Sequence, residues 1–144
     1  MPIDPYLIPG TEVLRNLLGI TTEAELYRVE GSVTTARINQ LEQGTVRLRG
    51  RWDIAHLQAV HRHIFQDVYD WAGKLRTIAM SKGPDLHPLP RMAYGLAIFE
   101  RLAQDSQLRG LETEAFVAKL SQVQSELFAW HPFREGTPAR RRLL

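Results

Sequence analysis

The sequence of 144 residues contains no cysteine. This absence excludes thiol catalysis, thiolate metal sites and a disulfide framework, and it is compatible with a reducing cytoplasm, which is the compartment we expect. No window approaches the apolar length of a membrane span. Residues 1–5 also lack the basic and apolar regions of a signal peptide. We therefore expect no association with a membrane.

Net charge is low. The 18 lysines and arginines exceed the 16 acidic residues by two, so charge alone does not argue for a nucleic-acid partner. Three arginines are consecutive at Arg140 to Arg142, and together with Arg134 they leave nucleic-acid binding open as a weaker alternative. With 44% hydrophobic residues and no internal repeat, residues 1–144 are expected to form one domain.

Apolar residues at three- and four-residue steps predict a mostly helical protein. The expected helices cover 11–18, 22–42, a segment capped by Asp53 and closed by Trp71 and Gly73, a segment opened by Pro90, and a segment from Gly110 to Trp130. Thr22 to Glu25 has the spacing of a capping box. The last helix is expected to carry a wide inward-facing apolar stripe, made by Phe116, Val117, Leu120, Val123, Leu127 and Phe128.

Two segments are not expected to be helical. Residues 1–10 contain Pro5, Pro9 and Gly10 and predict an irregular N-terminal arm. Residues 74–80 alternate polar and apolar side chains, and the turn at 81–84 then reverses the chain. We interpret residues 74–86 as a flap built on one short β-hairpin, so the predicted fold class is all-α with a single hairpin.

The segment from His131 to Gly136 carries the chemistry of the sequence. Pro132 ends the preceding helix and Gly136 permits a sharp turn. Histidine titrates near neutrality and can accept a proton from a hydroxyl, while Glu135 is an oxygen ligand suited to Mg²⁺ bound with phosphates. This pairing suggests phosphoryl or nucleotidyl transfer.

A helix that restarts after Gly136 would point its first N–H groups at an anion in the turn. Arg140 to Arg142 could then reach phosphate oxygens as forked donors, although a solvated basic tail is an alternative for this triplet. His61 and His63 are two residues apart and so lie on different faces of a helix, which favours core or surface histidines over a zinc pair.

The segment at His131 resembles the signature of Fic domain proteins, His-Pro-Phe-x-(Asp/Glu)-Gly-Asn-Gly-Arg-x-x-Arg. Its first six positions match His131 to Gly136. The resemblance extends to residues 4–16, to 64–73 with its Asp-Trp-Ala-Gly, and to the flap at 75–83, which together span most of the chain.

The resemblance implies an enzyme that moves AMP from ATP to a Ser, Thr or Tyr hydroxyl of a target protein and releases pyrophosphate. His131 would be the general base, Phe133 the hydrophobic anchor of the loop, and Glu135 the ligand of Mg²⁺. Gly136 would open the anion hole.

The resemblance also implies contacts to the rest of the nucleotide and to the target. Thr137, Arg140 and Arg142 would lie at the phosphates, with Arg142 at the position of the last signature arginine. The flap residues Ser81, Lys82 and Gly83 would cover the nucleotide and dock the target by strand-like pairing. Residues 131–142 would thus form the signature loop and the start of a helix.

The signature is altered where the family has Asn-Gly-Arg, because this chain has Thr137-Pro138-Ala139. The substitution shortens one phosphate-contacting side chain, removes an arginine and removes a backbone N–H. An alternative interpretation is therefore a catalytically impaired relic or a binding module that keeps the fold.

Some members of the family carry an inhibitory helix with the motif Ser/Thr-x-x-x-Glu-Gly/Asn. Here Glu42 has Ile38 four residues earlier and Gln43 after it, so the motif is absent. The resemblance then implies that restraint of this kind would come from a small antitoxin chain acting in trans, with this chain as the toxin.

Overall fold

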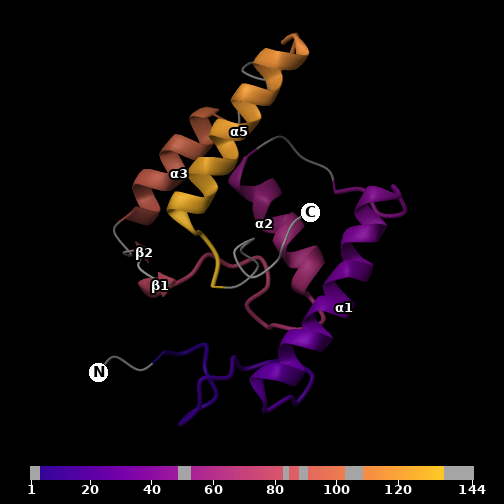
Figure 1. Ribbon diagram of the computed structural model, residues 1–144, viewed down its shortest axis with the longest axis vertical. Helices are drawn as coiled ribbons and strands as arrows, with labels where there is room; N and C mark the ends of the chain where they lie inside the picture. Colours follow the sequence, from indigo (N-terminus) through magenta and orange to yellow (C-terminus); the bar gives the residue numbers. More distant parts are fainter. Residues whose placement is uncertain (1–3, 49–52, 83–84, 88–90, 103–108, 135–144) are drawn as a thin grey trace. The chain divides into compact units, whose positions relative to one another are not determined.

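A computed structural model describes residues 4–48, 53–82, 85–87, 91–102 and 109–134. Within these residues it has four helices, coloured by position along the chain in Figure 1: α1 (Glu23–Glu42), α2 (Ile54–Phe65), α3 (Arg91–Leu102) and α5 (Thr113–Trp130). The predicted all-α class is confirmed. No helix of the described residues is long and apolar enough to cross a membrane.

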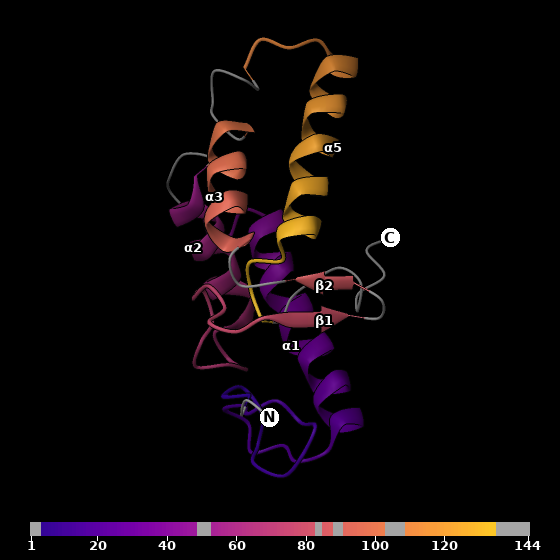
Figure 2. The same cartoon turned by 90° about the vertical axis from the view of Figure 1, so that its left-hand side faces the viewer.

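Two three-residue strands accompany the helices. β1 (Met80–Lys82) pairs antiparallel with β2 (Asp85–His87), with Ser81 opposite Leu86 and Lys82 opposite Asp85. Figure 2 shows the two strands side by side. The strand predicted for 74–80 is wrong for all but its last residue, because strand pairing begins only at Met80.

The chain divides into two compact units. The first comprises Met1–Leu48 and Gln58–Lys74, and the second comprises Arg49–Leu57 and Leu75–Leu144. The boundary falls inside α2. Each unit has buried residues of its own.

The first unit is built on a series of aromatic contacts. Tyr69 stacks on Trp71 with ring centroids 4.6 Å apart, and Tyr6 meets the edge of Trp71 at 5.0 Å. Phe65 lies on the other side of Tyr69 at 6.0 Å and stacks on His61 at 4.6 Å. Such pairs favour offset and edge-to-face geometries, and burying them stabilises the fold.

The N-terminal part of this unit is irregular, and the helix predicted for 11–18 is wrong. Leu7 and Leu14 form an isolated antiparallel bridge instead. Asn16 donates to the carbonyls of Leu14 and Ile20 at 3.0 and 2.8 Å and accepts from the Ile20 N–H at 2.9 Å. These short-range bonds from an asparagine side chain compete with a helix.

Helix α1 begins one residue after Thr22, as predicted, but the Thr22 side chain makes no capping hydrogen bond. Its contact with the rest of the unit includes polar side chains. Arg37 donates to both carboxylate oxygens of Asp67, at 2.7 and 2.9 Å, and the Tyr69 hydroxyl donates to Glu30. The hydrogen bonds and charge of Arg37 hold the pKa of the Asp67 carboxyl below its usual value.

Helix α2 begins as predicted, because Asp53 Oδ1 accepts the His56 N–H at 2.9 Å. It ends at Phe65, earlier than the apolar pattern suggested. The Val68 and Tyr69 N–H groups both return to the Phe65 carbonyl, at 3.0 and 3.1 Å, which turns the chain there.

In the second unit α3 and α5 lie side by side, as Figures 1 and 2 both show. Phe99, Val123 and Trp130 form the buried cluster between them, and Trp130 is 0% exposed. The first turns of α5 extend beyond α3 (Figure 1). The inward stripe predicted for this helix is wrong there, because three of its members are exposed: Phe116, Val117 and Leu120.

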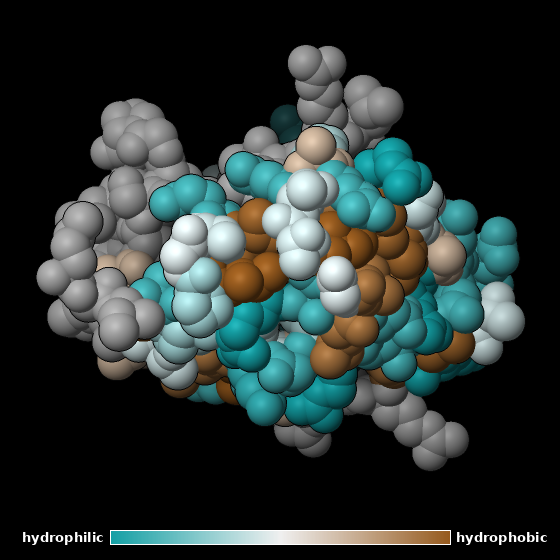
Figure 3. Space-filling model, turned by 90° about the horizontal axis from the view of Figure 1, so that it is seen from below, coloured by the Kyte–Doolittle hydropathy of each residue, from teal (hydrophilic) through white to brown (hydrophobic). Residues whose placement is uncertain are grey.

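Large apolar side chains reach the surface elsewhere as well. On the face drawn in Figure 3, hydrophobic side chains lie among hydrophilic ones. Leu17, Leu18 and Tyr27 of the first unit and Tyr94 of α3 are among the exposed apolar residues. Single exposed residues of this kind are ordinary in folded proteins and do not by themselves indicate a site.

Candidate active site

The candidate site is built at the C-terminal end of α5. Trp130 is the last helical residue, and His131 follows in a left-handed conformation with φ 54° and ψ 65°. The His131 N–H still donates to the Leu127 carbonyl at 2.8 Å, and Pro132 cannot continue the helix. The sequence prediction that the helix ends at this histidine is confirmed.

The conformation of His131 is unusual. Among the residues that the structure describes it is the only non-glycine residue with a positive φ. For an L-residue this conformation costs roughly 1–2 kcal/mol. Contacts around the turn must therefore hold His131 in place, and a residue held this way at a helix end is a candidate for function.

Both side chains that the sequence assigns to this turn are enclosed. His131 is 4% exposed and Phe133 is 6% exposed. A buried Phe133 fits an anchoring role, and a buried imidazole is shielded from bulk water. The roles themselves stay predictions.

Arg76 holds the turn from the segment that precedes β1. The residue is 3% exposed, and its guanidinium donates to three main-chain carbonyls: His131 at 2.6 Å, Trp130 at 3.2 Å and Ile78 at 2.7 Å. Its own N–H donates to the Pro132 carbonyl at 2.9 Å. The last carbonyls of a helix have no partner within the helix and form the negative end of its dipole, so a buried cation is well placed there.

Sequence reasoning missed this function of Arg76 and used the residue only as part of an alternating strand. The pattern did contain a signal, since Arg76 follows the apolar Leu75 closely after the buried Trp71, and a charged side chain near a core needs partners. What the pattern does not give is the identity of those partners, because they are main-chain carbonyls 54 and 55 residues further along the chain.

Trp130 is positioned by a close approach of α3. A Cβ added at Gly95 would lie 2.3 Å from Cγ of the Trp130 indole, so only glycine leaves room for the ring. Phe99, one turn further along α3, contacts the same indole with ring centroids 6.0 Å apart. The residue immediately before His131 is therefore held on its side chain by α3 and on its carbonyl by Arg76.

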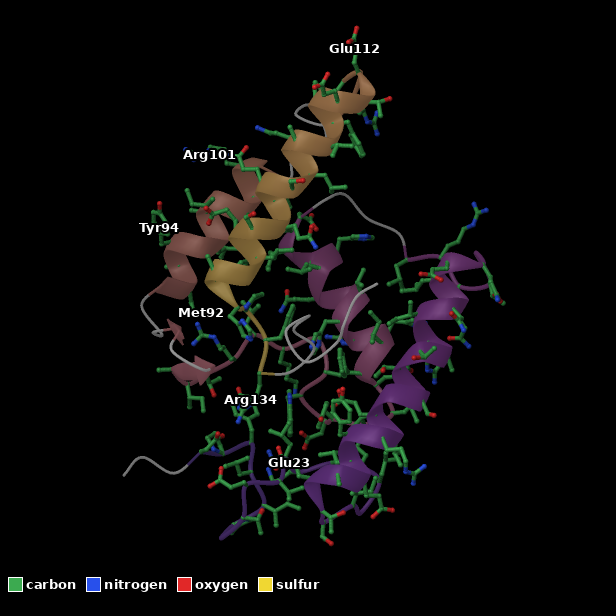
Figure 4. All side chains as sticks on the ribbon, viewed as in Figure 1. Glu23, Met92, Tyr94, Arg101, Glu112 and Arg134 are labelled. Atoms are coloured by element: carbon green, nitrogen blue, oxygen red, sulfur yellow. The ribbon has the colours of Figure 1, made fainter. Side chains whose placement is uncertain are left out.

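The other predicted site residues are placed only in part. Ser81 and Lys82 lie in β1, and Gly83 lies outside the described residues. Arg134 is the last described residue, and Figure 4 shows it past the C-terminal end of α5, at the opposite end from Glu112. The predicted metal and phosphate residues also lie outside the described part of the chain: Glu135, Gly136, Thr137, Arg140 and Arg142.

The signature segment contains one carboxylate that could ligate a metal, Glu135. The described residues contain no group of three or more histidine or acidic side chains that could hold an ion. A carboxylate such as Glu135 is the kind of oxygen ligand that Mg²⁺ uses when phosphates and water supply the remaining positions. The residue therefore fits a magnesium bound jointly with a nucleotide.

Comparison with known proteins identifies the family of the chain. Residues 51–142 match the Fic/DOC family, a range that contains α2, the strand pair, α3, α5 and the signature. The chain belongs to the Fic/DOC family. The Fic signature therefore lies where α5 ends and His131 turns.

Two curated relatives are a protein adenylyltransferase and a probable protein adenylyltransferase. The chain is 39% identical over 135 residues to protein adenylyltransferase VbhT of Bartonella schoenbuchensis. That alignment covers 92% of this chain and 28% of VbhT. The chain is 35% identical over 144 residues to the probable protein adenylyltransferase Fic of Escherichia coli. This alignment covers 97% of this chain and 69% of the relative. By homology the Fic domain described here is an enzyme of the protein adenylyltransferase class.

A solved structure of a Bartonella effector protein has the same fold. The Bartonella tribocorum effector BepC, solved with bound AMPPNP, is 26% identical and superposes with a TM-score of 0.80 over 95% of this chain and 72% of that protein. That homologue therefore binds an adenine nucleotide.

Proposed function

We propose that this chain transfers AMP from ATP to a Ser, Thr or Tyr hydroxyl of a target protein. The observation that carries the proposal is the enclosed His131 at the end of α5, in a Fic-family chain and in the position of the signature histidine. His131 accepts the proton of the target hydroxyl. The hydroxyl oxygen then bonds to the α-phosphorus while the bond from that phosphorus to the bridging oxygen breaks, and pyrophosphate leaves.

In this proposal the signature residues after His131 bind the triphosphate. Glu135 holds Mg²⁺, whose contribution when bound is to neutralise phosphate charge. Gly136 opens the anion hole and supplies its one main-chain N–H, and Thr137, Arg140 and Arg142 contact phosphate oxygens. Nucleotide binding by the similar BepC structure supports an adenine nucleotide as donor.

The flap docks the target in the same proposal. Within the part of the chain that the structure describes, β1 and β2 form a two-stranded ribbon in which one edge of each strand has no partner strand. An extended segment of the target can add to such an edge through main-chain hydrogen bonds, which would place its hydroxyl near the nucleotide. Ser81, Lys82 and Gly83 are the residues that we assign to this docking.

A second candidate function is a Fic domain that keeps its fold and lacks full activity. The observation that favours it is Thr137-Pro138-Ala139 in place of Asn-Gly-Arg. Loss of one donor aimed at developing charge typically lowers the rate by about 10²–10³. Such a domain would bind nucleotide or target without efficient turnover.

Transfer of α-labelled ATP into proteins of a bacterial lysate, with Mg²⁺ present, separates the two candidates. The native chain is compared with His131→Ala and with the triple substitution Thr137→Asn, Pro138→Gly, Ala139→Arg. Label that requires His131 supports the transferase. Label from the triple variant alone supports the impaired domain. If neither the native chain nor the triple variant transfers label, and calorimetry detects no ATP binding, both candidate functions are contradicted.

We also propose that a small antitoxin chain restrains the activity in trans, since the chain lacks the inhibitory motif at Glu42. Purification of the tagged chain expressed from its native locus tests this idea. A stoichiometric small partner that suppresses labelling is expected. Purification of the chain alone, in a form no less active than the recombinant protein, would contradict it.

A further inference from the structure

Arg76 is a buried cation of the second unit whose hydrogen bonds converge on the end of α5. Four of its donors, three in the guanidinium and one in the main chain, bind the carbonyls of Ile78, Trp130, His131 and Pro132. Three of these carbonyls are consecutive and surround the proposed general base. One residue thus fixes the main chain on both sides of His131.

The contacts of Arg76 bear directly on the conformation of His131. A left-handed residue at a helix end turns its carbonyl away from the helix, so that carbonyl needs another donor. The Arg76 Nε–H supplies it at 2.6 Å, which is short for such a bond and typical of a charged donor. The main-chain φ and ψ of His131, which this bond stabilises, set the direction of its Cβ and therefore the position of its imidazole.

Arg76 also ties the turn to the flap. Its Nη1 donates to the Ile78 carbonyl, two residues before β1 begins at Met80. The planar fork of a guanidinium holds its acceptors in fixed relative directions, which an ammonium group cannot do. A shift of the strand pair would therefore be transmitted through Arg76 to the carbonyls at the end of α5.

We propose that Arg76 is a positioning residue for His131, which holds the base in its left-handed conformation and couples it to the segment leading into β1. This inference rests on the proposed function for its effect on catalysis. The claim that Arg76 fixes the conformation of His131 rests only on the geometry of the Arg76 hydrogen bonds. Displacement of a catalytic group by about 1 Å can cost about 10²-fold in rate, so loss of the fork is expected to lower turnover strongly.

Arg76→Lys is the principal test, because it keeps the positive charge and removes the fork. Arg76→Met removes both. The matched control is Arg37→Lys, which removes the fork of the Arg37–Asp67 pair in the first unit. The full-length chain carries each substitution, and the measurements are kcat, KM for ATP, the thermal midpoint and the sign of φ at His131.

The sign of φ is measured in isotope-labelled protein from the intraresidue HN–Hα NOE of His131, which is strong at positive φ. We expect Arg76→Lys to lower kcat by about 10–100-fold with little change in KM for ATP, and to weaken that NOE. Arg37→Lys should change neither. A merely structural role would lower the thermal midpoint and leave both the folded-state kcat and the NOE unchanged.

The NOE needs no enzymatic activity, so it decides the positioning role even if the native chain transfers no label. Wild-type kcat or an unchanged His131 NOE in Arg76→Lys would overturn the proposal. If Arg76→Met fails to fold, the lysine variant alone decides. Failure of the proposed function is recognised separately, by native protein that shows the positive φ and no His131-dependent transfer.

Discussion

The ends of α2 and α5 both bury a histidine and a tryptophan, but they hold the histidine in opposite ways. At the end of α2 the His61 ring itself is a structural partner, since its Nδ1 accepts the Gly73 N–H at 2.9 Å. At the end of α5 the main chain of His131 is the part that Arg76 holds. The His61 imidazole thus binds the main chain at Gly73, whereas the main chain of His131 is bound by Arg76 and sets the position of its imidazole.

This difference separates a structural histidine from a candidate base. Because His61 Nδ1 is an acceptor, its ring must be unprotonated at that nitrogen, and protonation there would break the bond to Gly73. The bonds that hold the His131 turn use its N–H and its carbonyl. A proton can therefore be gained or lost at the His131 ring without breaking these main-chain bonds.

Gly73→Ala should produce the largest loss of stability, because it disturbs the residue that His61 holds after α2. Gly73 has φ +82°, and an added Cβ would lie 2.7 Å from Arg62 Cβ and 2.8 Å from the Gln58 carbonyl oxygen. Left-handed strain and overpacking together are expected to cost about 2–5 kcal/mol. Urea denaturation measures the loss, and transfer per folded molecule should stay at the wild-type rate.

Gly31→Ala is the matched control for glycine replacement. Gly31 lies inside α1, and nothing would approach an added Cβ within 4 Å. Alanine in a helix interior is favoured over glycine by about 0.5–1 kcal/mol, so this variant should be more stable than the native chain. Gly73→Ala as stable as Gly31→Ala would contradict the described end of α2.

Gly95→Ala should have the next largest effect on stability and, unlike Gly73→Ala, should also lower activity. An added Cβ would collide with the Trp130 indole, which precedes His131. Overpacking of this kind costs about 1–3 kcal/mol and reverses the gain that alanine normally brings to a helix. Urea denaturation and kcat are measured together. A stabilised variant with native kcat would contradict the packing described for Trp130.

The Arg37–Asp67 pair should show the smallest effect and is confined to the first unit. Its hydrogen bonds lower the pKa of Asp67, so the pair stabilises the folded chain above the unfolded pKa of about 3.9. That contribution is lost as the pH falls through the lowered folded value. The thermal midpoint of Arg37→Met should thus be below that of the native chain at pH 6 and converge with it in strong acid.

An equal difference in midpoint at both pH values would show that Arg37 acts through packing and not through the charge of Asp67. Transfer activity per folded molecule should not respond to this substitution. A loss of activity in Arg37→Met would show that the effect of this pair is not confined to the first unit.

The sequence predicted those parts of the structure that depend on local pattern. Helices α1 and α5 begin and end close to the residues that periodicity and Pro132 indicate, and α2 begins where Asp53 indicates but ends earlier than its apolar pattern. The histidine at the end of α5 was found because a proline marks the stop. These features need only neighbours within one or two turns of helix.

The failures arose where distant partners or local competition decide. Residues 11–18 have helical periodicity, but Asn16 uses its side chain to bond the main chain around it. Residues 74–79 alternate like a strand, but the Arg76 N–H donates to the Pro132 carbonyl and its guanidinium donates to the His131 carbonyl at the end of α5. The Arg76 contacts could not be derived from spacing, because the chain between the partners includes α3 and α5.

AMP transfer by His131→Asn and by His61→Ala shows which of these two buried histidines is the base. Asparagine tolerates the left-handed conformation, so His131→Asn should fold and lose transfer by about 10²–10⁴-fold. His61→Ala should lower the thermal midpoint and still transfer label at the native rate per folded molecule. Transfer that survives in folded His131→Asn, or disappears only in folded His61→Ala, would contradict the account.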